Sequence, residues 1–394
     1  MQVKGFSAAA VAAGIRYAGR LDLGMIFSRT PAVTAGTFTT SRVKAAPLLL
    51  DMERLRSGRA QAVLVNSGNA NACTGQEGLD LAQATSALAA RELGIDESLV
   101  QVASTGVIGQ QLRTEPFAQA MPQLVAQLSE DGFDELARAI MTTDLVPKVA
   151  TATVLFDDAE VSILGVAKGS GMIMPNMATM LCFVVTDAHI AYPLLDRLVK
   201  SGVEQSFNRI TVDGDTSTND MVLVMANGEA GNALIDDPDR PEARLFGEAL
   251  SGVFKDLALK IVADGEGATK MVTIRVTGAR TDQEALDAAR TIANSPLVKT
   301  AFFGEDANWG RIIAALGRSQ CHFDQHRVAI SFDAVRLVEN GLYTGAEAEA
   351  AATAVLKQRQ FTVTIDLSEG EGEAEMYTCD FSYDYVKINA DYRS

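Results

Sequence analysis

One threonine stands where a loop meets a buried strand. Residues 168–178 contain two glycines, a serine and a proline, which favour tight or irregular backbone. Residues 180–186 form an apolar run of strand length that ends at Asp187. Thr179 lies at the junction, where a hydroxyl group can be held rigidly with one side open to a substrate and where the preceding peptide bond can be strained.

The chemistry open to such a threonine includes cutting its own chain. If the Thr179 hydroxyl attacks the carbonyl carbon of Ala178, the amide becomes an ester, and water then releases a new amino terminus at residue 179. The freed α-amine, with a reference pKa of about 7.7–8.0, can be neutral near pH 7 and act as the base for its own hydroxyl group. Composition alone favours a simpler interpretation, a glycine-rich turn before a core strand, because threonine is common where strands start.

The same stretch resembles the self-processing site of a known enzyme family. Residues 168–173 read Lys-Gly-Ser-Gly-Met-Ile, and after a short spacer residues 178–181 read Ala-Thr-Met-Leu. This pattern is that of the ornithine acetyltransferases, also called bifunctional glutamate N-acetyltransferases, of arginine biosynthesis. The similarity extends from near the amino terminus to the last residue. It implies a cut between Ala178 and Thr179, giving a fragment 1–178 and a fragment 179–394 that begins with the nucleophile.

A glycine-containing turn could hold the negative charge of a reaction intermediate. Residues 99–103 read as a strand that runs into Ser104, Thr105 and Gly106. A glycine lets a backbone N–H point at a ligand, as an oxyanion hole requires, although the residues alone favour a simple turn. The resemblance implies that Thr105 and Gly106 form the oxyanion hole.

Several polar residues far apart in the sequence could contact an amino acid substrate. The ammonium group of Lys168 could bind a substrate carboxylate, and the carboxylate of Glu266, between two glycines, could select amino groups. Taken singly, each is more typical of a solvent-exposed residue. Besides Thr179, the resemblance assigns substrate contacts to Thr142, Lys168, Glu266, Asn389 and Ser394. Thr142 is favoured over Thr143 within the Met-Thr-Thr-Asp motif, and Ser394 stands where the family often ends in threonine.

Alternating strand and helix patterns must position these residues. Strands are expected at 34–45, 62–65, 99–103, 150–156, 161–166 and 221–225, and helices at 52–60, 77–93, 117–141, 193–207 and 244–262. Such alternation favours a mixed α/β fold with sheets packed between helices. Polar loops follow or precede the buried strands at residues 66–75 and 211–220, and we expect the second to border the site.

Length, charge and missing motifs exclude several functions. The 394 residues suffice for two or three domains, and a net charge of −16 argues against nucleic acid as a partner. No Walker A or GxGxxG pattern and no convincing metal motif occurs; the loop from Asp213 has Thr218 where a calcium loop needs glycine. We therefore expect neither cofactor nor metal. Four scattered cysteines and the lack of a membrane-length apolar run predict a cytoplasmic protein.

The leading hypothesis is acetyl transfer by a ping-pong mechanism. Thr179 takes acetyl from N2-acetylornithine, ornithine leaves, and glutamate receives the acetyl group. The residues do not decide whether acetyl-CoA is a second donor. The resemblance also implies an α2β2 assembly of the cut fragments. Two alternatives are an N-terminal-nucleophile hydrolase such as an aminopeptidase, which would release acetate to water, and a non-catalytic binding protein, which would stay uncut.

Overall fold

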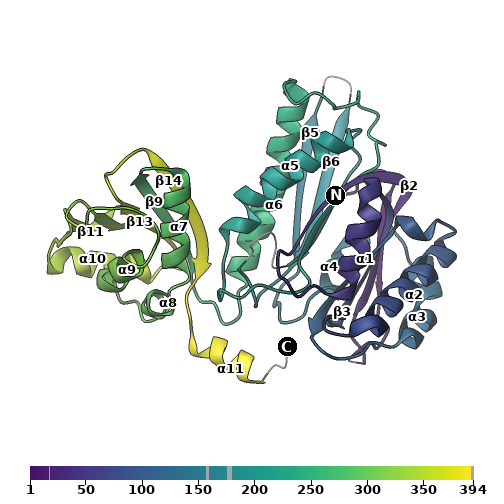
Figure 1. The fold of residues 1–394 in the computed structure, drawn as a ribbon, viewed down its shortest axis with the longest axis horizontal. Helices are drawn as coiled ribbons and strands as arrows, with labels where there is room; N and C mark the ends of the chain where they lie inside the picture. The colour runs from purple at the N-terminus through teal and green to yellow at the C-terminus, as the bar shows by residue number, and fades with distance from the viewer. Residues whose placement is uncertain (17, 157–158, 175–179, 392–394) are drawn as a thin grey trace. The chain divides into compact units, whose positions relative to one another are not determined.

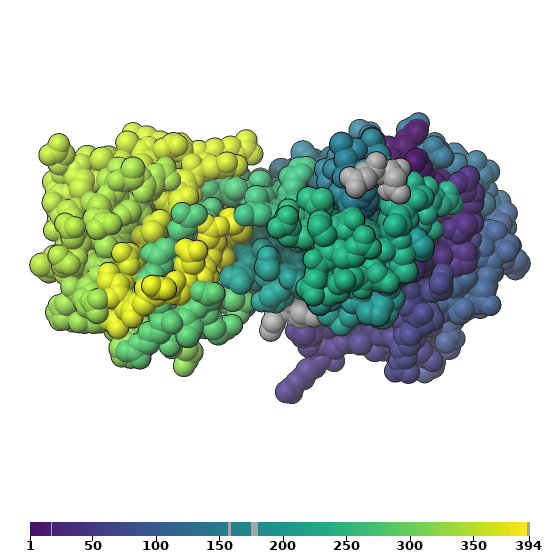
Figure 2. All heavy atoms as spheres, turned by 90° about the horizontal axis from the view of Figure 1, so that it is seen from above, coloured from purple at the N-terminus to yellow at the C-terminus, as the bar shows by residue number. Residues whose placement is uncertain are grey.

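The computed structural model describes residues 1–16, 18–156, 159–174 and 180–391, and the chain divides into two compact units (Figure 1). Unit 1 comprises Met1–Asn208 and Asp215–Ile261, and unit 2 comprises Arg209–Gly214 and Val262–Arg393. In the space-filling view, the yellow-green to yellow end of the chain belongs to unit 2 (Figure 2). Each unit is built on a mixed β-sheet with helices, which confirms the predicted α/β class.

The sheet of unit 1 has the strand order β4-β3-β2-β8-β7-β6-β5, with β1 paired to β2. The pairs β3–β4 and β7–β8 are parallel, and the other pairs are antiparallel. Its strands are β1 (Phe6–Val11), β2 (Leu23–Phe38), β3 (Arg59–Asn69), β4 (Val100–Val107), β5 (Lys148–Leu155), β6 (Glu160–Lys168), β7 (Leu181–Thr186) and β8 (Met221–Ala226).

Helices cover this sheet because its strands are apolar on both faces. On one face, Met25 and Leu64 pack in the same core cluster as Phe117 and Leu124. The neighbouring residue Val63 points to the other face and joins a second cluster, as the two-residue period of a strand requires. The helices of unit 1 are α1 (Ala46–Arg54), α2 (Gly75–Leu93), α3 (Thr114–Ala126), α4 (Phe133–Ala139), α5 (Tyr192–Gln205) and α6 (Pro241–Ala263), the last ending across the unit boundary.

Unit 2 has a smaller sheet of order β12-β11-β10-β13-β9-β14, in which only the pair β13–β9 is parallel among the described residues. Its strands are β9 (Met271–Ala279), β10 (Ala329–Phe332), β11 (Val335–Glu339), β12 (Leu342–Tyr343), β13 (Gln360–Asp366) and β14 (Gly372–Cys379). Its helices are α7 (Asp282–Ala293), α8 (Pro296–Phe303), α9 (Trp309–Leu316), α10 (Ala346–Leu356) and α11 (Tyr383–Asp391). None of the described helices is both long and apolar enough to cross a membrane.

Three of the predicted elements are wrong in detail. The strand expected at 34–45 is β2, which begins at Leu23 and ends at Phe38, where its pairing with β8 stops at Met221. The helix predicted at 117–141 is two helices, α3 and α4, because the chain between them forms a bridge in which Ser129 exchanges backbone hydrogen bonds with Ala8. The helix predicted at 52–60 is α1, which begins at Ala46 and ends at Arg54, and Pro47 lies in its first turn. Proline lacks a backbone N–H, and the first turn of a helix does not need that donor.

Candidate active site

The carboxyl ends of β3 and β4 approach each other very closely. Gly68 is paired with Gly106, whose φ angle is +132°. A Cβ atom on Gly106 would lie 2.3 Å from the carbonyl carbon of Gly68 and 2.6 Å from the backbone nitrogen of Asn69. Only glycine therefore fits at residue 106, next to Thr105, which is 8% exposed.

The side chains of two asparagines, Asn66 and Asn219, hydrogen-bond to backbone carbonyl groups at this end of the sheet. The Asn219 amide donates to the carbonyl oxygens of Ala70 (2.6 Å) and Ser104 (2.8 Å). The Ser104 hydroxyl donates to Asn66 (2.7 Å), whose own amide donates to the carbonyl oxygen of Asn69 (3.0 Å). These bonds fix the peptide groups on either side of the predicted oxyanion loop and join the polar loops after β3 and before β8.

Lys168, at the end of β6, lies beside the same loop. Its ammonium group donates to the Thr105 hydroxyl oxygen at 3.3 Å, although the two residues are 63 positions apart. Lys168 is 9% exposed. A hydroxyl group has one hydrogen to donate and two lone pairs, so this bond leaves the hydroxyl hydrogen of Thr105 available to another acceptor.

Asp144 connects the Met-Thr-Thr-Asp motif to the residue after Lys168. One carboxylate oxygen accepts from the Lys148 ammonium group and from the backbone N–H of Gly169, both at 2.7 Å. The other oxygen accepts from the backbone N–H of Thr142 at 3.0 Å. The carboxylate thus joins two segments that both carry predicted substrate-binding residues.

The charges around Asp144 decide its protonation state. Burial by itself raises the pKa of this carboxyl group, but the positive charges of Lys168 and Lys148 and the hydrogen bonds from Lys148 and Gly169 outweigh it and lower the pKa to about 2. Asp144 is therefore ionised near neutral pH, and its carboxylate faces the ammonium group of Lys148. Their side chains are 0% exposed, so the pair is a buried salt bridge.

The two threonines of the motif make different contacts. The Thr143 hydroxyl group lies 2.8 Å from the hydroxyl group of the fully buried Ser170. Thr142 contacts Asp144 through its backbone, and both threonines are partly exposed. The structure does not test which of the two contacts a substrate, so the preference for Thr142 stays a prediction.

The predicted residue Glu266 lies in unit 2, in a loop that is hydrogen-bonded to the carboxylate of Asp380. Asp380 is fully buried and accepts from the backbone N–H groups of Thr269 (2.8 Å) and Lys270 (2.9 Å) and from the Thr269 hydroxyl (2.5 Å). The Ser382 hydroxyl donates to the carbonyl oxygen of Gly267 at 2.6 Å. Unlike Asp144, this carboxylate is satisfied by uncharged donors.

Asn389 on α11 reaches the same loop. Its side-chain amide donates to the Glu266 carboxylate at 2.8 Å. Gly267 has φ +69°, and a Cβ atom there would lie 2.4 Å from the backbone nitrogen of Tyr385, so the loop and the first turn of α11 fit only with glycine at this position. Glu266 itself is 7% exposed.

The structure therefore collects the predicted residues in two groups, one in each unit. Unit 1 brings together Thr105, Gly106, Thr142 and Lys168, and unit 2 brings together Glu266 and Asn389. The predicted cleavage site at Ala178 and Thr179, and the predicted contact Ser394, lie outside the described residues. Their roles, like those of the other site residues, stay predictions.

Sequence reasoning missed the buried residues that support these groups. Asp144, Lys148 and Asp220 are ionisable residues with at most 7% exposure, and Asp380 is fully buried. The one available signal was position, since Asp144 is the last residue of the Met-Thr-Thr-Asp motif and Asp220 is the last residue of the polar loop at 211–220. Among the described residues, no group of three or more His, Cys, Asp or Glu side chains is placed to hold a metal ion.

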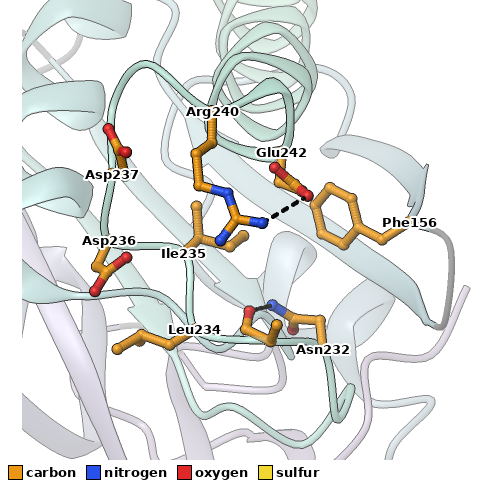
Figure 3. Close-up of a pocket in the computed structure, with 9 residues that line it drawn as sticks. Phe156, Asn232, Leu234, Ile235, Asp236, Asp237, Arg240 and Glu242 are labelled. Carbon is orange, nitrogen blue, oxygen red and sulfur yellow. Dashed lines mark hydrogen bonds and ion pairs between the residues drawn. The ribbon is translucent and has the colours of Figure 1, made fainter.

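A separate cavity of about 230 Å³ contains none of these residues. Arg240 points toward the Glu242 carboxylate at 3.4 Å (Figure 3). The cavity is lined by these two residues and by Phe156, Asn232, Ala233, Leu234, Ile235, Asp236 and Asp237. Phe156 follows the end of β5 that pairs with the start of β6, whereas Lys168 ends β6. The cavity thus lies at the opposite end of this hairpin from the predicted site.

Comparison with known proteins identifies the family. The ArgJ family matches residues 7–394. The proteins named arginine biosynthesis bifunctional protein ArgJ from Desulfotalea psychrophila and Geobacter sulfurreducens are 59% and 53% identical, each over the full length of both chains. A crystal structure of the protein of that name from Bacillus halodurans is 46% identical, with a TM-score of 0.51; the match covers 53% of this chain and 98% of that chain.

These matches confirm what the motif at residues 168–181 predicts. Identity extends over the whole chain, and the matched relatives carry the name of an arginine biosynthesis protein. The predictions of the family and of an enzyme that acts in this biosynthesis are confirmed. The chain belongs to the ArgJ family.

Proposed function

We propose that the protein transfers an acetyl group from N2-acetylornithine to glutamate, after cutting itself between Ala178 and Thr179. The observation that carries the proposal is the hydrogen bond between Lys168 and Thr105. It joins a predicted carboxylate-binding cation to a predicted oxyanion-hole hydroxyl group at one end of the sheet. Such a pair can bind an N-acetyl amino acid by its carboxylate and stabilise the intermediate formed at its acetyl group.

The reaction then follows from the residues. The Thr179 hydroxyl attacks the acetyl carbon while the α-amine of the same residue takes the hydroxyl proton. The negative oxygen of the tetrahedral intermediate accepts hydrogen bonds from the Thr105 hydroxyl group and from the backbone N–H of Gly106. The α-amine returns the proton to the departing nitrogen, ornithine leaves, and glutamate accepts the acetyl group by the reverse steps. Water must be excluded from the acetyl-enzyme, or the acetyl group is lost as acetate.

Two findings support a cut chain and a second reaction. The solved ArgJ chain from Bacillus halodurans corresponds to 53% of this chain and is itself covered to 98%, a length close to that of the predicted fragment 179–394. The relatives are named bifunctional. We therefore include acetyl-CoA-dependent acetylation of glutamate in the proposal, together with an α2β2 assembly in the cytoplasm and substrate contacts by Glu266, Asn389 and Ser394.

The test combines cleavage with acetyl exchange. We expect the purified wild-type protein to run as two fragments on a denaturing gel. The variant Thr179→Ala should run as one uncut chain and transfer no acetyl group. The matched control Thr151→Ala changes an exposed threonine on β5 and should cut and transfer normally. An uncut active wild type contradicts the proposal.

The fate of the acetyl group distinguishes the alternatives. Transfer from N2-acetylornithine that requires glutamate supports the proposal, whereas equal acetate release with and without glutamate supports a hydrolase. Replacing N2-acetylornithine by acetyl-CoA in the same assay tests the second reaction. Light scattering on the purified protein tests the α2β2 assembly.

A further inference from the structure

Lys299 is a buried lysine that the reaction above does not use. It lies on α8 in unit 2 and is 1% exposed. Its Nζ atom donates hydrogen bonds to the Thr378 hydroxyl group at 2.7 Å and to the carbonyl oxygen of Cys379. Burying an amino group costs free energy, and a methionine of similar length would fill the same space without that cost. The lysine therefore calls for a reason beyond packing.

The partners of Lys299 all belong to one segment, residues 378–381, which comprises the end of β14 and the turn after it. The backbone carbonyl of Lys299 accepts from the N–H of Phe381 at 3.2 Å, and its Nζ atom lies 4.6 Å from the centroid of the Phe381 ring. Asp380 lies in the same segment, and its carboxylate accepts from two backbone N–H groups of the loop that carries Glu266. Lys299 thus holds the segment to which that loop is bonded.

The ring of Phe381 connects the same segment to α11. It stacks on the ring of Tyr385, with the centroids 4.7 Å apart and an angle of 16° between the planes. Tyr385 is in the first turn of α11, and its backbone carbonyl accepts from the side-chain amide of Asn389 at 3.0 Å. The same amide nitrogen donates to the Glu266 carboxylate at 2.8 Å. An amide nitrogen has two hydrogens to donate, so the position of Tyr385 fixes the direction from which Asn389 meets Glu266.

We propose that Lys299 is a positioning residue for Glu266 and Asn389, acting through Asp380 and Phe381. This inference rests on the proposed function, in which Glu266 and Asn389 contact the substrate. Lys299 itself does not touch the substrate. N2-acetylornithine has one free amino group, because its α-amine carries the acetyl group, and the Glu266 carboxylate can bind that free amino group. Lys299 keeps the carboxylate in the orientation that this contact needs.

The expected effect of losing this support is on KM. Lys299→Met keeps the length of the side chain and removes its donor, so the end of β14 can shift relative to the loop that carries Glu266. We expect KM for N2-acetylornithine to rise roughly tenfold, since a contact with the free amino group is weakened in the bound substrate and in the transition state alike. For the same reason kcat should stay within about twofold of the wild-type value.

A purely structural role would give a different result. If Lys299→Met only lowers stability, fewer molecules are folded, so the apparent kcat falls while the KM of the folded molecules does not change. Phe332→Leu is the matched control, because it removes part of a fully buried side chain of the same core on β10 and should leave KM unchanged. Equal rises of KM in both variants, or a fall of kcat alone in Lys299→Met, overturn the inference.

A second variant covers the case in which Lys299→Met does not fold. Phe381 is partly exposed, and Phe381→Leu removes its stacking on Tyr385, so we expect KM to rise about threefold. Tyr343→Leu is the control: its ring stacks on Trp309 at 6.5 Å, and it lies on β12, at the opposite edge of the six-stranded sheet from β14. An unchanged KM in Phe381→Leu overturns the inference.

The coupling between Lys299 and Glu266 is the most direct test. If Lys299 acts through Glu266, Lys299→Met should raise KM no further in an enzyme that already carries Glu266→Ala, and additive rises overturn the inference. N-acetylnorvaline, which is N2-acetylornithine lacking the free amino group, repeats the test on the substrate. Its kcat/KM should be the same for the wild type and for Lys299→Met, and a tenfold loss with this analogue also overturns the inference.

Failure of the proposed function looks different from failure of the inference. A wild type that transfers no acetyl group refutes the proposed function. An unchanged KM in Glu266→Ala refutes the substrate contact of Glu266, and the role of Lys299 with it. A raised KM in Glu266→Ala together with a wild-type KM in Lys299→Met refutes the inference alone.

Discussion

Two regions each hold a predicted substrate-binding residue, and they do so by different physics. Around Lys168 in unit 1, the segments are joined by buried charges, because the positive charges of Lys168 and Lys148 lower the pKa of Asp144 and keep it ionised. Around Glu266 in unit 2, Asp380 is satisfied by two backbone N–H groups and a hydroxyl. The first arrangement depends on protonation and on the presence of every charged partner, whereas the second depends on loop geometry.

The difference indicates what each region can do. A cluster of buried charges can be left with one unit of charge in excess, which suits the capture of a charged substrate group. A loop fixed by uncharged donors holds Glu266 in place through the geometry of its backbone. Three substitutions test whether the two regions differ as described, and they are given in order of decreasing effect.

The largest effect should follow from breaking the buried salt bridge. Asp144→Ala leaves the Lys148 ammonium group buried without its carboxylate, so we expect the free energy of unfolding to fall by about 3–5 kcal/mol. Chemical denaturation measures it. The double variant Asp144→Ala with Lys148→Met removes both charges and should regain a large part of the loss. If the single variant is as stable as the wild type, the salt bridge does not hold this region.

A smaller effect should appear on acidification. Because the pKa of Asp144 is lowered to about 2, its stabilising contribution of about 2 kcal/mol is fully present above about pH 4 and is lost as pH falls toward 2. Asp144→Asn lacks this contribution, so the stability difference between it and the wild type should shrink over that range. Denaturation curves at several acidic pH values measure the difference, and a constant difference would show that Asp144 is not ionised by its neighbours.

The smallest effect should come from the loop in unit 2. Ser382→Ala removes the hydrogen bond to Gly267 and should cost about 1 kcal/mol of stability. If Glu266 contacts substrate, KM should rise several-fold while kcat changes less. Ser368→Ala, which removes a hydroxyl bonded only within its own exposed turn, is the control. An effect of the same size in both variants would mean that the loop does not position Glu266.

The sequence supported the fold class and the local elements with simple patterns. The continuous apolar run at 62–65 predicted a buried strand, and β3 contains it. The pattern could not reveal that residues 117–141 break into two helices, because the break is made by a backbone bridge from Ser129 to Ala8, more than a hundred positions away. Strand order across eight strands was likewise beyond local patterns.

The candidate site residues that stand in motifs could be predicted from the sequence. The buried residues that hold them in place could not. Lys168 and Thr105 stand in recognisable motifs, and their hydrogen bond could follow only from the fold. Asp144 was visible in a motif, but its ionisation depends on Lys148 and Lys168, whose positions relative to it no spacing rule gives. Asp220 looked like one polar loop residue among several until the strand register placed it at the end of the sheet near Lys168.

The strand order of unit 1 has a consequence for any cut after residue 178. β7 and β8 would belong to the downstream polypeptide, yet they sit between β2 and β6 of the upstream one, hydrogen-bonded along both sides. The strands of the two fragments would therefore alternate within one sheet. Separating the fragments would break the backbone hydrogen bonds of two strand pairs, β2–β8 and β6–β7. The fragments should therefore co-purify through an affinity tag on one of them and separate only on denaturation.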